Sequence, residues 1–378
     1  MKVKNTFFYL SKNLMVLCLW GAALQAQPLD PGQARMDTSG QTLWYDAQLL
    51  TLEGQGWAET RSPYDRLPAK AEGLVPEAVW DLGQHSAGIS LQFRTDAEEI
   101  QVKWTLLNAS LAMAHMPATG VSGVDLYEKN EEGTWRFVAN GRPRHQSNTV
   151  EFDVTPETDL RLYLPLYNGV TSLEIGIPPS RNLIRLNPEL VSSRAESRDE
   201  GRGRFRPIIF YGTSITQGGC VSRPGLSVTA IVGRELDIPT INLGFSGSGK
   251  MEAEMAELLS ELDPAIYVLD CLWNMDNEMV ATRVKPFVRI LRKHHPRTPI
   301  LLVEDSSFEN ISPTSNGQIL RCLYQELKEE GVQHIEFLSN EDMLGRDYEG
   351  TVDGVHHNDL GMMRQAEVFK VKLASMLE

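Results

Sequence analysis

The chain has few cysteines for its length, with only four in 378 residues. Cys18 lies in an N-terminal apolar run, which leaves Cys220, Cys271 and Cys322 as an odd and widely spaced set. A disulfide-stapled scaffold needs a denser, even set of cysteines. Hydrophobic cores must therefore hold the fold together, and a chain of this length with 42% hydrophobic residues is expected to form about two of them.

Basic residues are scarce relative to acidic ones. The chain has 36 Lys plus Arg against 50 Asp plus Glu, which gives a net charge of −14. Such a surface repels the phosphates of nucleic acids and anionic lipids. We therefore expect no nucleic-acid partner.

Long hydrophobic runs are also missing. The run Leu14–Leu24 is too short for a bilayer, which needs about 20 apolar residues. It follows a basic start at Lys2 and Lys4 and precedes small residues. Residues 1–26 are thus typical of a secretory signal peptide, with a short membrane anchor as the alternative. We expect a secreted or periplasmic protein without stable membrane insertion.

Residues 27–191 contain short runs in which apolar and polar residues alternate, such as Ile100–Trp104 and Leu173–Ile177. Period-two alternation at this spacing predicts an antiparallel β-sandwich, jelly-roll-like in organisation. Large aromatic side chains here suit either a core or a platform for sugars, and a core is the more usual role. The tryptophans of this part are Trp44, Trp57, Trp80, Trp104 and Trp135.

Residues 192–206 are dense in charge and predict a linker. In residues 207–378 apolar strands alternate with helical stretches, which predicts an α/β domain with three α/β/α layers and a mostly parallel sheet. The expected strands are 208–211, 240–243, 265–269, 300–303 and 335–338, and the expected helices lie near 225–236, 251–261, 276–294, 317–330 and 358–377. Ligands of such sheets bind at the carboxyl ends of the strands.

The first of these strands ends in Gly212-Thr213-Ser214, and Gly218 follows four residues later. A serine just past a buried strand exposes its hydroxyl at the head of the next helix, where backbone N–H groups can receive an oxyanion. Ser214 is therefore a candidate nucleophile. A plain helix-capping serine is the alternative.

The last helix is preceded by Asp353 and, three residues later, His356. At this spacing the carboxylate can reach one ring nitrogen while the other faces a nucleophile. His357 is the neighbouring candidate, ranked second because it lies four residues from Asp353. The alternative interpretation is an exposed capping aspartate beside surface histidines.

Two further strand ends supply hydrogen-bond donors. The second strand runs into a glycine-rich segment, Gly244–Gly249, in which backbone N–H groups can point into a cleft. The third strand ends near Asn274, whose amide can donate to a developing negative oxygen. A flexible turn and an asparagine that merely ends a strand are the alternatives.

Together these four blocks resemble the SGNH/GDSL hydrolases, whose name records a Ser, a Gly, an Asn and a His in this order. The resemblance covers about residues 207–378. It implies that Ser214 is the nucleophile, that His356 is the general base and that Asp353 orients it. It also implies an oxyanion hole formed by the Ser214 N–H, the Gly247 N–H and the Asn274 side chain.

Two departures from the family pattern leave every catalytic atom in place. Thr213 stands where the family has Asp before the serine, and Met275 stands where it has Asp after the asparagine. The tract 213–225 also looks like a bacterial subgroup in which a small β domain with a Gly-x-Asp-Leu-Tyr segment precedes the hydrolase. Residues 123–127 match that segment, so the resemblance reaches the first domain.

A nucleotide-binding protein is the sharpest rival, because residues 244–250 fit the spacing of a phosphate loop up to Lys250. The pattern fails at Met251, where a hydroxyl should meet Mg²⁺. The pairs 294–295 and 356–357 are adjacent histidines, but no companion spacing completes a metal site. We expect neither a cofactor nor a metal.

The sequence thus predicts a secreted serine esterase that acts through an acyl-enzyme on short acyl groups, especially acetyl esters of carbohydrates. The carbohydrate part depends on the resemblance, on secretion and on the tryptophan-bearing first domain. The alternatives are a lipid or phospholipid acylhydrolase, a thioesterase, or a non-catalytic glycan-binding protein. A lipase is disfavoured because no long exposed apolar segment indicates a large apolar entrance.

Overall fold

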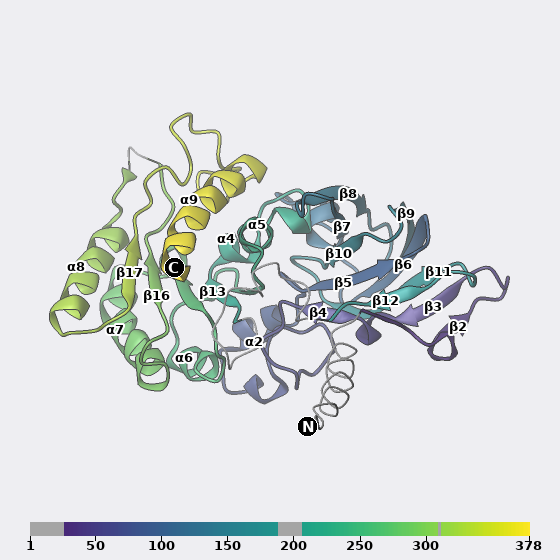
Figure 1. The fold of residues 1–378 in the computed structure, drawn as a ribbon. Coiled ribbons are helices and arrows are strands. Elements are labelled where there is room, and N and C mark those ends of the chain that lie inside the picture. Colours follow the sequence, from purple (N-terminus) through teal and green to yellow (C-terminus); the bar gives the residue numbers. More distant parts are fainter. Residues whose placement is uncertain (1–25, 188–205, 309–310) are drawn as a thin grey trace, which may run out of the picture.

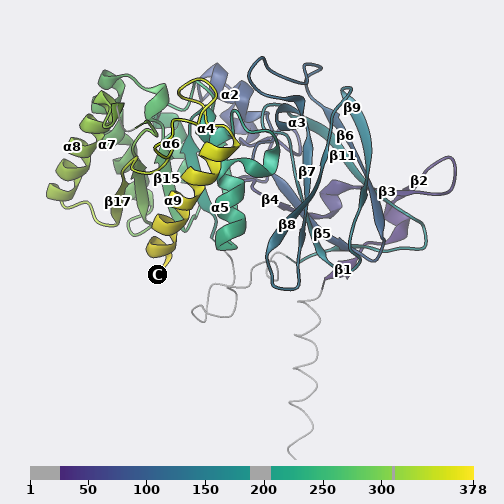
Figure 2. The ribbon, with the colours of Figure 1, turned by 90° about the horizontal axis from the view of Figure 1, so that it is seen from above.

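The computed structural model describes residues 26–187, 206–308 and 311–378. The expected signal peptide and linker lie outside these ranges, apart from Ala26 and Arg206. An N-terminal β part and a C-terminal α/β part lie side by side, as the views from the front (Figure 1) and from above (Figure 2) both show. None of the helices in the described ranges is long and apolar enough to cross a membrane.

The N-terminal part consists mainly of two antiparallel sheets. One sheet has the order β1-β12-β5-β10-β7-β8, with β4 paired to β5, and the other has the order β2-β3-β11-β6-β9. The strands are β1 Gln27–Pro28, β2 Arg35–Met36, β3 Leu43–Asp46, β4 Thr51–Glu53, β5 Ser90–Thr95, β6 Glu99–Leu106, β7 Val124–Lys129, β8 Trp135–Gly141, β9 Ser147–Asp153, β10 Asp159–Tyr163, β11 Val170–Ile177 and β12 Leu183–Arg185.

A hydrophobic core fills the space between these two sheets. In β6 every second residue is buried, including Val102 and Trp104, and these side chains meet Leu126 and Leu162 of the other sheet. This alternation is what places one face of each strand in the core. All five tryptophans of this part are buried, which confirms the core interpretation and leaves none of them as an exposed platform for sugars.

The C-terminal part has a five-stranded, wholly parallel sheet of order β14-β13-β15-β16-β17. The predicted strands and helices are confirmed to within about three residues at each end. The elements are β13 Ile208–Gly212, α4 Ser214–Gln217, α5 Val228–Leu236, β14 Thr240–Gly244, α6 Ala253–Leu259, β15 Ile266–Asp270, α7 Asn277–His294, β16 Ile300–Val303, α8 Ser315–Glu329, β17 Ile335–Leu338 and α9 Asp359–Leu377.

Helices cover both faces of this sheet. Alternate residues of β13 point to opposite sides: Ile209 and Tyr211 meet α6, α7 and α8, while Ile208 and Phe210 meet α5 and α9. Two covered faces explain why the strands are continuous apolar runs rather than alternating ones.

The order of the strands determines where a site can form. The chain passes from β13 to β14 on one side and then crosses to β15 on the other, so the strand order reverses at β13. In open α/β sheets, ligands bind outside the carboxyl ends of the strands at such a reversal. Ser214 follows β13 directly and therefore lies at this point.

Residues of the N-terminal part also complete the core of the C-terminal part. Helix α2 (Glu77–Gly83) and the segment around it contribute Trp57, Leu67 and Val79 to the core that includes residues of α6 and α7, and Figure 1 shows α2 near α6. Leu166 and the short helix α3 (Ala118–Val121) join the core on the opposite face. The division at residues 192–206 remains a prediction, but the packing shows that residues before it are shared with the C-terminal core.

Candidate active site

Ser214 is placed by a tight junction between β13 and α4. Thr213 caps α4, because its hydroxyl accepts the N–H of Ile215 while the Thr216 hydroxyl accepts the N–H of Thr213. This reciprocal pair satisfies backbone donors that a helix start would leave unpaired. Thr213 stands where the related families have Asp, and it performs this capping without a charge. Ser214 is 7% exposed.

The His356 imidazole lies against Ser214. Its Nε2 is 3.0 Å from the Ser214 Oγ, although the two residues are 142 positions apart. Its Nδ1 is 2.7 Å from Oδ2 of Asp353 on the same loop before α9. The three side chains that the sequence suggested for nucleophile, base and orienting group therefore form one continuous hydrogen-bond chain.

Asp353 is held by its own loop. Its Oδ1 accepts the backbone N–H groups of Val355 and His356, at 3.0 and 2.8 Å. Partial burial would raise the pKa of Asp353, but the hydrogen bonds from His356 and Val355 and the charge of His356 lower it to about 2. The carboxylate is consequently ionised at every pH at which the protein would work, which suits an anion that stabilises an imidazolium.

His357 occupies a different environment from its neighbour. It is fully buried, and its Nε2 is 2.8 Å from the Ser306 Oγ rather than near Ser214. Burial lowers the pKa of His357 to about 3, although a hydrogen bond with Gln365 opposes this shift and the charge of His356 adds to it. A neutral, buried imidazole of this kind is a packing group behind the loop.

The segment after β14 forms a tight turn that carries Gly247. The N–H of Ser248 donates to the carbonyl of Phe245, and Gly247 has φ +67°, a left-handed conformation that favours glycine. Gly249 approaches the backbone so closely that a Cβ there would lie 2.0 Å from the Gly212 oxygen. Helix α6 begins only at Ala253, so this segment does not open a helix as a phosphate loop does.

Asn274 lies after β15, on the other side of β13 from Gly247. Its Nδ2 donates to the carbonyl oxygens of Phe245 and Gly249, at 3.1 and 3.3 Å. The amide thus joins the two ends of the turn that carries Gly247. In this arrangement both amide hydrogens of Asn274 point to protein oxygens, so the side chain stabilises the conformation of the turn.

Several residues around the site could not be identified from the sequence. The Tyr167 hydroxyl donates to the carbonyl oxygen of Ser214 at 3.0 Å, and the His115 ring lies 5.9 Å from the His356 ring, centroid to centroid. The Gln217 Oε1 accepts the N–H of Ser246. Tyr167 and His115 come from the N-terminal part, and no local pattern marks either of them.

The Gly-x-Asp-Leu-Tyr segment was the one signal that linked the two parts. Asp125 is completely buried and accepts hydrogen bonds from Arg223 and from the Gly225 N–H, at 3.0 and 2.8 Å. The Tyr127 hydroxyl lies 2.6 Å from the same guanidinium. The segment therefore binds Arg223 and Gly225, which follow α4 in the chain, to strand β7 of the N-terminal part.

A Ser–His–Asp hydrogen-bond chain at the reversal point of a parallel sheet is the arrangement of a serine hydrolase. Two family models match the chain. Residues 205–374 match the GDSL-like lipase/acylhydrolase family, and residues 42–183 match the GxDLY family, the N-terminus of SGNH-hydrolase-type esterases. The chain belongs to the GDSL-like lipase/acylhydrolase family and is an ester hydrolase.

Solved structures extend the likeness over nearly the whole chain. A protein of Bacteroides ovatus described as a GDSL-like lipase is 31% identical, with a TM-score of 0.79 over 89% of this chain and 98% of its own. A salicylyl-acyltransferase from a tetracycline biosynthetic pathway is 17% identical, with a TM-score of 0.67 over 93% and 97%. An acetyl xylan esterase of Butyrivibrio proteoclasticus is 11% identical, with a TM-score of 0.54 over 88% and 99%. The last two share the fold. A search of curated proteins finds no match.

Proposed function

We propose that this protein is a secreted serine esterase that removes short acyl groups, acetyl in particular, from carbohydrates. The observation that carries the proposal is the hydrogen-bond chain from Ser214 through His356 to Asp353, with distances of 3.0 and 2.7 Å. It contains a nucleophile, a base and an anion in the order that acyl transfer requires.

In the proposed mechanism the Ser214 oxygen attacks the ester carbonyl and forms a covalent acyl-enzyme. His356 takes the serine proton at Nε2 and then gives it to the departing alkoxide, so the alcohol leaves as a neutral molecule. Water then hydrolyses the acyl-enzyme by the same steps. His356 accepts a proton from water, and the hydroxide adds to the acyl carbon. The carboxylic acid leaves as the Ser214 oxygen regains its proton from His356. Asp353 remains ionised throughout and holds the ring.

The negative oxygen of each tetrahedral intermediate needs donors. We assign this role to the backbone N–H groups of Ser214 and Gly247, with Asn274 as a third donor when its amide turns from the Phe245 carbonyl. The turn geometry of Gly247 supports the assignment, because its left-handed conformation sets the direction of the neighbouring peptide groups.

The carbohydrate part of the proposal is supported by three of the structural relatives. An acetyl xylan esterase and family-two carbohydrate esterases of Clostridium thermocellum and Cellvibrio japonicus share the fold. The predicted signal peptide agrees with a substrate outside the cell. A lipid acylhydrolase is the second candidate.

The first experiment identifies the nucleophile. Ser214→Ala should abolish both ester hydrolysis and covalent labelling by a fluorophosphonate, while circular dichroism and melting temperature stay close to those of the wild type. Ser248→Ala, a half-buried serine in the neighbouring turn, is the matched control and should still be labelled. Labelling that persists in Ser214→Ala would reject the proposed nucleophile.

The second experiment identifies the substrate. Turnover of p-nitrophenyl esters should be highest for acetate and fall with chain length, and acetate should be released from acetylated xylan or other acetylated glycans. A rate that rises with chain length, or that increases above the critical micelle concentration of the substrate, would favour the lipid acylhydrolase.

A further inference from the structure

Strand β14 is an outer strand of the parallel sheet and pairs only with β13. Alternate residues of a strand present their N–H and C=O groups to the same side, so Asn242 and Gly244 both face away from β13. Their outward groups need other partners. The side chain of Asn242 accepts the N–H of Gly244 at 2.9 Å. The outward acceptors of this edge are the two carbonyl oxygens.

Those two oxygens are bound by an arginine from the N-terminal part. The Arg66 Nη1 donates to Gly244 O at 2.7 Å and to Asn242 O at 3.1 Å, across 178 and 176 positions of sequence. Its other nitrogens donate to Leu82 O at 2.6 Å and to His85 O at 2.9 Å. Four carbonyl oxygens thus fix one guanidinium group.

Arg66 is unusual because its charge has no acidic partner. It is 1% exposed, and within residues 26–187, 206–308 and 311–378 no carboxylate forms an ion pair with it. Burial lowers the pKa of Arg66 to about 9, with Tyr167 opposing the shift, so the group is still protonated at neutral pH. A buried charge without a counter-ion is costly unless every donor is well placed. The four carbonyl acceptors supply that placement.

One of the carbonyls that Arg66 binds belongs to Gly244, the residue at which the turn that carries Gly247 begins. Phe245 follows Gly244 directly, and the face of its ring lies 4.9 Å from the guanidinium carbon of Arg66. The next peptide is held by Gln217, which accepts the Ser246 N–H at 3.0 Å, and Gln217 also lies 3.2 Å from the His85 ring of the N-terminal part. Gly247 comes next in the chain.

We propose that Arg66 is a positioning residue for the oxyanion hole: it caps the open edge of β14 and so sets the orientation of the turn that carries Gly247. This inference depends on the proposed esterase function. It explains why the N-terminal part is built into the core of the hydrolase: a separate hydrolase domain would leave this edge to water.

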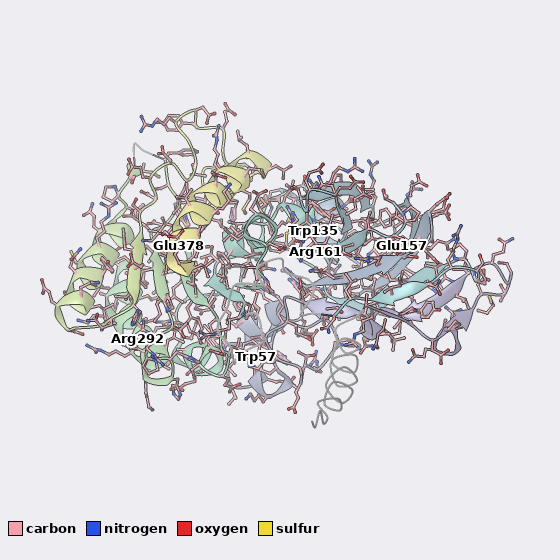
Figure 3. All side chains as sticks on the ribbon, in the orientation of Figure 1. Trp57, Trp135, Glu157, Arg161, Arg292 and Glu378 are labelled. Carbon is pink, nitrogen blue, oxygen red and sulfur yellow. The ribbon has the colours of Figure 1, made fainter. Side chains whose placement is uncertain are left out.

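The test compares Arg66→Met with Arg161→Met. Arg161 is also buried in the N-terminal part, paired with Glu53 at 3.0 Å and stacked on Trp135, beside which Figure 3 labels it. Both variants should lower the melting temperature. Only Arg66→Met should lower kcat, by about 10- to 100-fold with little change in KM, because sub-ångström to 1 Å misplacement of catalytic groups has effects of this size.

Active sites are counted by exhaustive labelling with a fluorophosphonate, so that kcat refers to folded protein. Arg66→Lys keeps the charge but loses the planar fork, and it should show a smaller fall in kcat than Arg66→Met. If Arg66→Met does not fold, Arg66→Lys takes its place in the comparison with the wild type. Equal kcat per labelled site in wild type, Arg66→Met and Arg161→Met would overturn the inference, as would equal kcat in wild type and Arg66→Lys if Arg66→Met does not fold. Failure of Ser214 to be labelled would instead reject the esterase mechanism itself.

Discussion

The two loops that flank Ser214 are organised in different ways. The loop with Asp353 and His356 makes its defining hydrogen bonds within three residues, and Asp353 remains 44% exposed. The turn with Gly247 is held by partners that are distant in sequence, namely Arg66, Gln217 and Asn274. One half of the candidate site is therefore locally encoded, whereas the other is assembled by tertiary contacts.

This difference has a consequence for function. A local hydrogen-bonded loop keeps its geometry as long as its own few residues are intact. A turn that depends on several distant residues responds to changes in each of them, including those in the N-terminal part.

The largest effect should come from the imidazole that faces Ser214. His356→Ala should lower kcat by on the order of 10⁶-fold, because nucleophile and base act as a unit. His357→Ala, which removes the buried neighbour bound to Ser306, should mainly lower the melting temperature. Steady-state rates per mole of folded protein distinguish the two, and similar losses of kcat in both would contradict the assignment of His356.

Asp353→Asn should lower kcat by about 10⁴-fold with little change in KM, because an amide favours the wrong imidazole tautomer. Asp347→Asn is the matched control: Asp347 is also exposed and also ion-paired, but to Arg364 in place of the catalytic histidine. Its kcat should stay near that of the wild type. A fall of less than tenfold in Asp353→Asn would show that the loop does not need the carboxylate.

Asn274→Ala should lower kcat by about 10²- to 10³-fold, the size of effect seen when an oxyanion donor is removed. Because Asn274 and Arg66 both hold the turn of Gly247, the double variant Arg66→Met/Asn274→Ala should lose less than the product of the two single losses. In contrast, Arg66→Met combined with Asp353→Asn should be additive in free energy. Additivity in both pairs would mean that Arg66 and Asn274 do not act on a common element.

His115 tests whether the N-terminal part contacts substrate. Its exposed ring lies beside that of His356, so we expect His115→Ala to lower kcat/KM on acetylated glycans by about fivefold, equivalent to about 1 kcal/mol of lost contact. Hydrolysis of p-nitrophenyl acetate should change little, because its leaving group is small. His145→Ala, another exposed histidine of the same part, is the control. Equal effects on both substrates would place His115 outside the alcohol-binding region.

The smallest effect concerns stability rather than rate. Burial raises the pKa of Asp270 to about 7; the hydrogen bond from Thr216 opposes the shift and the nearby Asp305 adds to it. Since the folded state favours the protonated acid, stability should fall as the pH rises from about 4 to about 7. Asp270→Asn should show a weaker fall in melting temperature between pH 5 and pH 8. If the melting temperature of Asp270→Asn falls between pH 5 and pH 8 by as much as that of the wild type, Asp270 is ionised in the folded protein.

The C-terminal fold was predictable because its signals are local. Apolar runs such as Ile208–Tyr211 and Ile300–Val303 coincide with the observed strands to within one residue. Sheet burial on both faces produces such runs directly. The N-terminal sandwich was predicted from alternation, but its helix α2 was missed, because that helix packs on the other part of the molecule and shows no separate amphipathic pattern.

The candidate site was predictable only in part, for a related reason. Ser214, Asp353 and His356 lie at element boundaries where short spacing limits the possible geometry, and the structure brings these three together. The resemblance supplied roles for Gly247 and Asn274, but not the contact of Asn274 with Phe245. Arg66 and Tyr167 had no signal at all, because an isolated arginine or tyrosine has the same sequence context whether it is buried or exposed.

The sequence by itself determined the order of strands and helices along the chain, the position of Ser214 after β13, and the pairing of His356 with Asp353, since each depends on periodicity or on a spacing of three residues. Only the tertiary structure decided that His357 is buried against Ser306, that Arg66 closes the edge of β14, and that Tyr167 binds the Ser214 carbonyl. These contacts join groups up to 178 positions apart. Which distant partner satisfies a buried polar group depends on how the whole chain packs, and no local pattern carries that information.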